Sequence, residues 1–111
     1  MERLHFEFPA GQPAASPAVT TAITRVVTGV VASGDLEVLL ATQGGALTTI
    51  AVQTSVDGYG GTWKALLERV FADATLPAAS IEINDNGATP GVVRMRIEQA
   101  FEEAQAAGGQ P

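Results

Sequence analysis

A serine followed by a glycine, Ser33-Gly34, is the feature of this sequence most open to chemistry. The pair separates two runs of aliphatic and β-branched residues, a pattern typical of two strands joined by a short turn. In such a turn the two residues most often serve the backbone, because glycine adopts positive φ without strain and serine tolerates solvent. The same geometry also suits an attachment point, since a turn on a rigid sheet presents its hydroxyl to a modifying enzyme. The residues alone leave both interpretations open.

The other polar residues give little support for catalysis. His5 is the only histidine and falls on the polar side of an expected strand, so we interpret it as an exposed surface residue. Because the chain also lacks cysteine, a metal would depend on carboxylates alone, and their spacing does not match a calcium loop. No Gly-x-Ser-x-Gly elbow is present. We therefore expect neither catalytic residues nor metal ligands.

Two further segments resemble sites but are more simply explained as structure. The glycines at 44–45, 58 and 60–61 lack the Lys and Ser/Thr of a phosphate-binding loop. The run Asn84-Asp85-Asn86-Gly87 is predicted to be a turn in which side chains cap the neighbouring backbone. Trp63 and Phe71 fit the apolar side of a helix rather than a platform for stacking bases.

Alternating apolar and polar residues predict the strands that position Ser33. These strands are expected at Leu4 to Phe8, near Ile23 to Val31, at Asp35 to Leu40, at Leu47 to Val56, and around Ile81 and Ile83. Pro9 ends the first of them, and residues 9–18 are expected to form a flexible loop because they contain helix- and strand-breaking residues.

Two segments have the apolar spacing of a surface helix. The first is predicted over Thr62 to Ala72, with Thr62 as its N-cap. The second is predicted over Pro90 to Ala106, with Thr89 as N-cap and Pro90 at the first helical position. Its buried side is expected to consist of Val93, Ile97, Ala100, Phe101 and Ala104.

The element order predicts an α+β fold: a two-layer sandwich of an antiparallel four- to five-stranded sheet with two helices on one face. Residues 1–111 are expected to form a single domain, with a tail at 107–111. Twelve acidic and six basic residues give a net charge of −6, which disfavours nucleic acid and anionic membranes and favours partners with basic patches. The absence of cysteine and of a secretory pattern at the N-terminus favours the cytoplasm.

Several separated blocks, in the correct order over nearly the whole chain, resemble the malonate decarboxylase acyl carrier protein (delta subunit) family. The blocks are Phe6 to Ala10, Ala32 to Leu39, Thr54 to Asp57 with Trp63, and Asp85 to Val92 followed by Arg94, Arg96, Glu98 and Gln99. Ala32 departs from a glycine common in the family, and the stretch from Gly11 to Arg25 is longer than expected. Acyl carriers that are helical bundles use an Asp-Ser-Leu motif, which this chain lacks.

The resemblance implies that Ser33 carries 2'-(5''-phosphoribosyl)-3'-dephospho-CoA through a phosphodiester. It further implies a non-catalytic carrier whose arm is acetylated at rest. An acetyl-/malonyl-transferase subunit then exchanges acetyl for malonyl, and a decarboxylase subunit releases carbon dioxide. A separate prosthetic-group transferase would load the serine. This scheme agrees with the composition, because a chain without cysteine must import the thiol that forms a thioester.

Three alternatives remain at this stage. The chain could serve as the acyl carrier of citrate lyase or of a related acyl system. It could be a structural or regulatory subunit with an unmodified Ser33. An enzyme is the third alternative, and no pair of nucleophile and base supports it.

Overall fold

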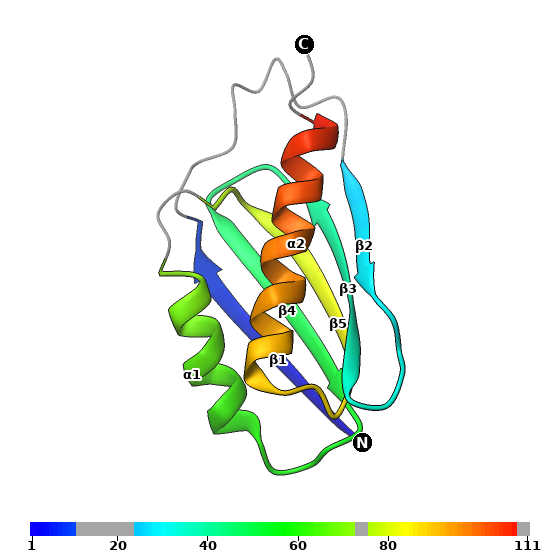
Figure 1. Cartoon of the computed structure of the whole chain (residues 1–111). Helices are drawn as coiled ribbons and strands as arrows, with labels where there is room; N and C mark the ends of the chain where they lie inside the picture. Colours follow the sequence, from blue (N-terminus) through cyan, green and yellow to red (C-terminus); the bar gives the residue numbers. More distant parts are fainter. Residues whose placement is uncertain (11–23, 73–75, 109–111) are drawn as a thin grey trace.

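The computed structural model describes residues 1–10, 24–72 and 76–108. Over these residues five strands form one sheet in the order β1-β4-β5-β3-β2, and two helices lie on the same face of it (Figure 1). The elements are β1 (Glu2–Pro9), β2 (Arg25–Gly29), β3 (Asp35–Thr42), β4 (Leu47–Thr54), α1 (Gly60–Val70), β5 (Ala79–Asn86) and α2 (Pro90–Gly108). The predicted α+β sandwich is confirmed.

The sheet is mostly antiparallel, with one parallel pair. β4 pairs antiparallel with β1, and β3 pairs antiparallel with both β2 and β5. β4 and β5 run parallel, with Thr54 opposite Asp85. A parallel pair requires a crossover, which α1 provides between β4 and β5. Alternation of apolar and polar residues does not reveal whether two strands pair parallel or antiparallel. The prediction of an antiparallel sheet therefore did not include the parallel pair of β4 and β5.

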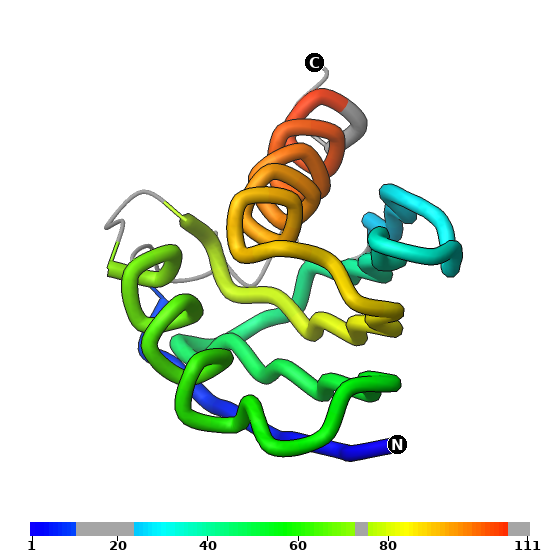
Figure 2. Tube along the Cα trace, turned by 60° about the horizontal axis from the view of Figure 1, so that its bottom comes forward, coloured from blue at the N-terminus to red at the C-terminus, as the bar shows by residue number. Residues whose placement is uncertain are grey.

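The apolar side of every central strand faces the helices. On β3 the residues Leu36, Val38 and Leu40 are buried, and on β5 Ile81 and Ile83 are buried in the same way. Burying side chains of this size stabilises the fold by roughly 1.5–3 kcal/mol each before conformational entropy is subtracted. Burial of this face therefore stabilises the packing of the helices on the sheet, and Figure 2 shows both helices over the same side of the strands.

The helices bury the predicted stripes, although α1 spans Gly60–Val70 rather than Thr62 to Ala72 and α2 continues to Gly108 rather than ending at Ala106. In α2, Thr89 accepts a hydrogen bond from the Val92 N–H at 3.3 Å through its hydroxyl, which confirms the predicted cap. In α1 the helix begins at Gly60, the cap residue is Tyr59, and no side chain caps it. The prediction of Thr62 as N-cap is therefore wrong, because the glycines before it already adopt helical geometry and place Thr62 inside the first turn.

Several strand boundaries also differ from the predictions: β3 continues to Thr42 rather than Leu40, and β4 ends at Thr54 rather than Val56. β5 continues to Asn86 because residues 84–86 pair with β3, so the predicted turn begins only at Gly87, where φ is +84°. β2 ends at Gly29 rather than Val31, since Gly29 has a φ of +76° that leaves the extended region. Pro9 ends β1 as predicted. Most of the loop predicted at 9–18, and the end of the predicted tail, lie outside the described residues.

Ile97 tests the packing of α2 on the sheet, because its side chain is 0% exposed. We expect Ile97→Ala to lower the free energy of unfolding by about 2–5 kcal/mol, since it leaves a cavity under the helix. Met95 lies on the same helix and is 49% exposed, so Met95→Ala should change the value by less than about 0.5 kcal/mol. Urea unfolding of both variants measures the difference, and similar costs for the two would contradict the described packing.

Candidate functional site

Ser33 is exposed and lies in the loop between Gly29 and Asp35 that joins β2 to β3, and Figure 1 shows this loop at the edge of the sheet. The loop closes through a hydrogen bond of 2.9 Å from the Asp35 N–H to the Ala32 carbonyl oxygen. Gly34 occupies the third position of this turn with φ +77°. The hydroxyl of Ser33 is thus presented to solvent, and a modifying enzyme can reach it.

The backbone attaches this loop to the neighbouring strand. The Gly34 N–H donates a hydrogen bond of 2.8 Å to the carbonyl oxygen of Asn86, at the end of β5. At the other end of the loop, a β-carbon added to Gly29 would lie 2.0 Å from the Leu36 carbonyl oxygen and 3.1 Å from Arg96 Nε. Position 29 therefore accepts only glycine, for reasons of both space and φ.

An ion pair joins the base of the loop to α2. Arg96 Nη2 lies 2.9 Å from Asp35 Oδ2, and Arg96 Nε donates to Asp35 Oδ1 at 3.3 Å. The side chains are 25% and 20% exposed, respectively. The Thr28 hydroxyl also donates to the Arg96 carbonyl oxygen at 2.9 Å. These contacts tie both strands that flank the serine loop to the same turn of the helix.

The Asp35–Arg96 contact changes the acidity of both groups. The hydrogen bond from Arg96 lowers the pKa of the Asp35 carboxyl, and a hydrogen bond from the Leu36 N–H lowers it further. The same contact raises the pKa of Arg96. Asp35 therefore stays ionised, and the loop stays joined to α2, well below neutral pH.

Asp85 forms a second polar centre on β5, next to the serine loop. Its side chain is buried, 7% exposed, and accepts hydrogen bonds from the Thr54 hydroxyl at 2.8 Å, the Gly87 N–H at 3.2 Å and the Ala88 N–H at 3.0 Å. The predicted capping of the backbone by Asp85 is confirmed. The bond from Thr54 was not predicted, because it depends on the parallel pairing of β4 with β5.

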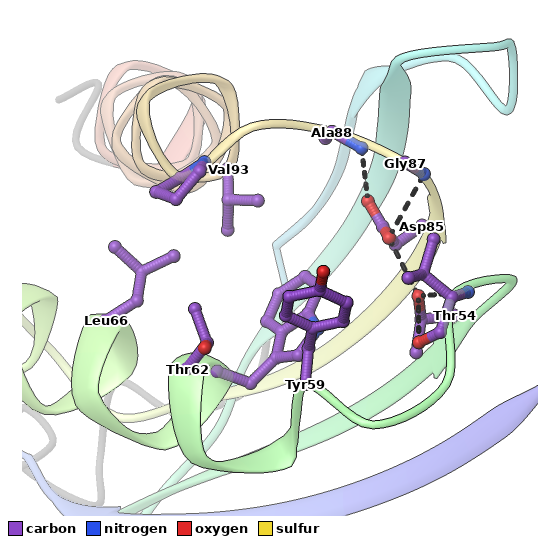
Figure 3. A pocket seen from close by; sticks show the side chains of 11 residues that line it. Thr54, Tyr59, Thr62, Leu66, Asp85, Gly87, Ala88 and Val93 are labelled. Atoms are coloured by element: carbon purple, nitrogen blue, oxygen red, sulfur yellow. Dashed lines mark hydrogen bonds between the residues drawn. The ribbon is translucent and has the colours of Figure 1, made fainter.

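A cavity of about 270 Å³ opens beside Asp85. It lies among the ends of β4 and β5 and the first turns of the two helices (Figure 3). The lining residues are Thr54, Val56, Tyr59, Thr62, Trp63, Leu66, Asp85, Gly87, Ala88, Pro90 and Val93. This cavity was not predicted from the sequence, because its walls come from four elements that only the tertiary fold brings together.

The remaining candidates stay apart from Ser33. His5 is exposed on β1, at the opposite edge of the sheet from β2, and lies 3.7 Å from Glu7. Ser33 and His5 therefore do not form a nucleophile–base pair. Within residues 1–10, 24–72 and 76–108 no group of acidic, histidine or cysteine side chains could hold a metal ion. No helix in these ranges is long and apolar enough to span a membrane.

The fold and the site define a small α+β domain that presents a serine on a braced loop rather than in a catalytic cleft. Residues 23–104 match the family model of the malonate decarboxylase delta subunit (MdcD). The chain is 57% identical over 104 residues to the malonate decarboxylase acyl carrier protein of Pseudomonas paraeruginosa, covering 94% of this chain and 97% of that protein. It is 53% identical over 103 residues to the protein of the same name from Pseudomonas fluorescens, covering 93% of this chain and 96% of that one.

A solved structure shares the fold as well. One chain in the crystal structure of a Pseudomonas malonate decarboxylase hetero-tetramer in complex with malonate superimposes with a TM-score of 0.78 at 53% identity. The superposition covers 94% of this chain and 99% of that one. The chain belongs to the malonate decarboxylase delta subunit family, as the resemblance in its sequence predicted.

Gly29 and Gly34 separate backbone strain from steric contact, because both have φ near +77° but only Gly29 is enclosed. Gly34→Ala has open space and should cost roughly 1–2 kcal/mol of unfolding free energy. Gly29→Ala meets the Leu36 carbonyl as well and should cost roughly 3 kcal/mol or more. Denaturant unfolding measures the loss of unfolding free energy in each variant. Equal losses would show that a β-carbon at position 29 meets no steric contact beyond the backbone strain.

The Asp35–Arg96 pair predicts a specific pH dependence. Above the ordinary Asp pKa of 3.8 the carboxylate is ionised in both states, and the pair contributes its full stabilisation. As the pH falls below 3.8 the unfolded chain binds the proton first, so this stabilisation is lost as the pH passes through the lowered pKa of the folded state. Asp35→Asn should therefore be less stable than the wild type at neutral pH, and the difference should shrink in acid.

Glu98→Gln provides the control for this measurement. Glu98 pairs with Arg94 at 3.2 Å, but both side chains are more than half exposed, so the pair contributes little. Unfolding followed from neutral pH into acid should show a smaller effect for Glu98→Gln than for Asp35→Asn. A stability difference between Asp35→Asn and wild type that does not change with pH would contradict the assignment.

Proposed function

We propose that the chain is the acyl carrier subunit of a malonate decarboxylase and holds acetyl and malonyl thioesters on 2'-(5''-phosphoribosyl)-3'-dephospho-CoA. The group is attached to Ser33 through a phosphodiester. The observation that carries this proposal is the exposed serine at the tip of a loop that is braced by β5 and α2. Membership of the malonate decarboxylase delta subunit family supports malonate as the source of the acyl group.

The residues at the site fit such a group. The Ser33 hydroxyl is exposed and can form the ester with phosphorus, whereas Ser55 donates its hydroxyl to Asn86 Oδ1 at 2.9 Å. The space beside the neighbouring Gly34 is open, since a β-carbon added there would meet no atom of the described residues within 4 Å. When bound, the group supplies the thiol that a chain without cysteine lacks.

The chain itself contributes position rather than bond-breaking groups. Asp35 and Arg96 hold the base of the loop, and the Gly34 N–H holds its tip against Asn86. A tethered acyl group then meets each partner at a high effective concentration. This role explains why Ser33 has no base beside it, and we infer that the subunit is not itself catalytic.

The partners follow from this role. They are an acetyl-/malonyl-transferase subunit and a decarboxylase subunit of the same complex, together with the transferase that loads Ser33, all in the cytoplasm. The structurally similar chain comes from a hetero-tetramer, which supports assembly with other subunits. The net charge of −6 favours partners with basic surfaces.

Ser33→Ala tests the attachment. Coexpressed with the loading transferase, the variant should lack the added mass of the prosthetic group and should not support carbon dioxide release from malonate in the assembled complex. Its unfolding free energy should stay within about 0.5 kcal/mol of wild type, because the side chain is exposed. Intact-mass spectrometry and urea unfolding measure the two effects.

Ser55→Ala is the matched control, since Ser55 is also exposed and lies close to Asn86. This variant should keep the adduct and the activity. An adduct on Ser33→Ala protein, or its loss from Ser55→Ala protein alone, would refute Ser33 as the attachment site. A wild-type chain that never acquires an adduct would favour a structural subunit with an unmodified serine.

A further inference from the structure

We infer that the cavity beside Asp85 binds the adenine base of the prosthetic group carried on Ser33. The inference rests on the proposed function and adds a site for one part of the group. The cavity and the serine loop meet the same end of β5, because Gly87 lines the cavity and the preceding residue, Asn86, accepts the hydrogen bond from the Gly34 N–H. Gly34 directly follows Ser33, so the attachment point lies close to the end of β5 that forms one wall of the cavity.

The order of units along the group selects the base as the occupant. The phosphoribosyl unit that is bound to Ser33 is joined to the 2' position of the adenosine ribose. Adenine is therefore separated from the serine by two sugars and one phosphate. The thiol lies at the far end, beyond a diphosphate and the pantetheine chain. The sugars, the phosphates and the pantetheine chain are not aromatic, so adenine is the unit of the group that suits an apolar cavity near the attachment point.

The lining of the cavity suits a flat, neutral aromatic ring. Tyr59 is 54% exposed, and its side chain makes no capping hydrogen bond to α1. Trp63, Leu66 and Val93 supply apolar surface from the two helices (Figure 3). Stacking of a base on an aromatic side chain is favourable for every base, because each has a π-face. The half-exposed ring of Tyr59 is free to serve in this way.

Asp85 adds a polar contact that favours the base over other parts of the group. A carboxylate offers about four acceptor positions, and the contacts from Thr54, Gly87 and Ala88 use three of them. The remaining position can accept a hydrogen bond from the exocyclic amino group of adenine. The negative charge of Asp85 repels the diphosphate and a malonyl carboxylate, so both stay outside the cavity.

Binding of the base would restrain the part of the prosthetic group next to Ser33. The end that carries the thiol would stay free to move. The diphosphate and the pantetheine chain would leave the cavity and remain free to reach partner active sites. The carrier would then confine the motion of the acyl group to the outer part of the arm, which raises its effective concentration near the docked partner.

Titration of the unmodified, 15N-labelled protein with adenosine tests the site. Adenosine should shift the amide signals of Thr62, Gly87 and Ala88 and the indole signal of Trp63 in a saturable way. S-acetylpantetheine at the same concentrations should leave these signals unchanged. In protein that carries the prosthetic group, the same signals should differ from those of unmodified protein.

Two variants at one position provide the control. Tyr59→Ala should weaken adenosine binding by about fivefold or more, whereas Tyr59→Phe keeps the ring and should bind adenosine nearly as wild type. Shifts caused by S-acetylpantetheine instead of adenosine, or no shift with adenosine, would overturn the inference. These outcomes are independent of the proposed function, because mass spectrometry detects the adduct on Ser33 whether or not the base occupies the cavity.

Discussion

The position of Ser33 depends on the ion pair between Asp35 and Arg96. Asp35 is the first residue of β3, two positions after the serine, and Arg96 lies on α2. Because α2 is packed on the sheet through Ile97 and its neighbours, the ion pair transmits that rigidity to the loop. Gly29 has no side chain because the Leu36 carbonyl and Arg96 occupy that space. The serine is therefore held on the body of the domain and is still exposed.

In the function that we propose, the chain and its partner subunits have different tasks. In this proposed function, the domain supplies a fixed point of attachment, a net charge of −6 and a cavity near the serine. A reactive thiol and the enzymes that act on its thioester come from outside the chain in the function that we propose. A rigid platform suits such a carrier, since the flexible part is then the arm itself.

Local patterns in the sequence predicted what local interactions determine. Alternation predicted β3 and β4, and the apolar stripe predicted α2 with its cap at Thr89. The exposed position of Ser33 also follows from the turn residues around it. These features depend on residues that are close together along the chain.

Long-range features were not predictable in this way. The Asp35–Arg96 contact joins residues 61 positions apart, and no spacing rule covers such a distance. The parallel pairing of β4 with β5 brings Thr54 to Asp85 and creates one wall of the cavity, and the pairing of β5 with β3 extends β5 through Asn86. The start of α1 at Gly60 rather than Thr62 shows that a weak capping preference gives way where a flexible glycine pair can enter the helix.

The most direct test of the account is to locate the prosthetic group within the wild-type chain taken from the assembled complex. Trypsin releases Val26 to Lys64 as one peptide, because no lysine or arginine lies between them, and this peptide contains both Ser33 and Ser55. Fragmentation by electron transfer keeps phosphodiesters intact. The masses of the fragments then show which of the two serines carries the group. If Ser33 carries the prosthetic group, the added mass will lie between Ala32 and Gly34. The same mass on Ser55 or on a threonine of this peptide, with Ser33 unmodified, would contradict it.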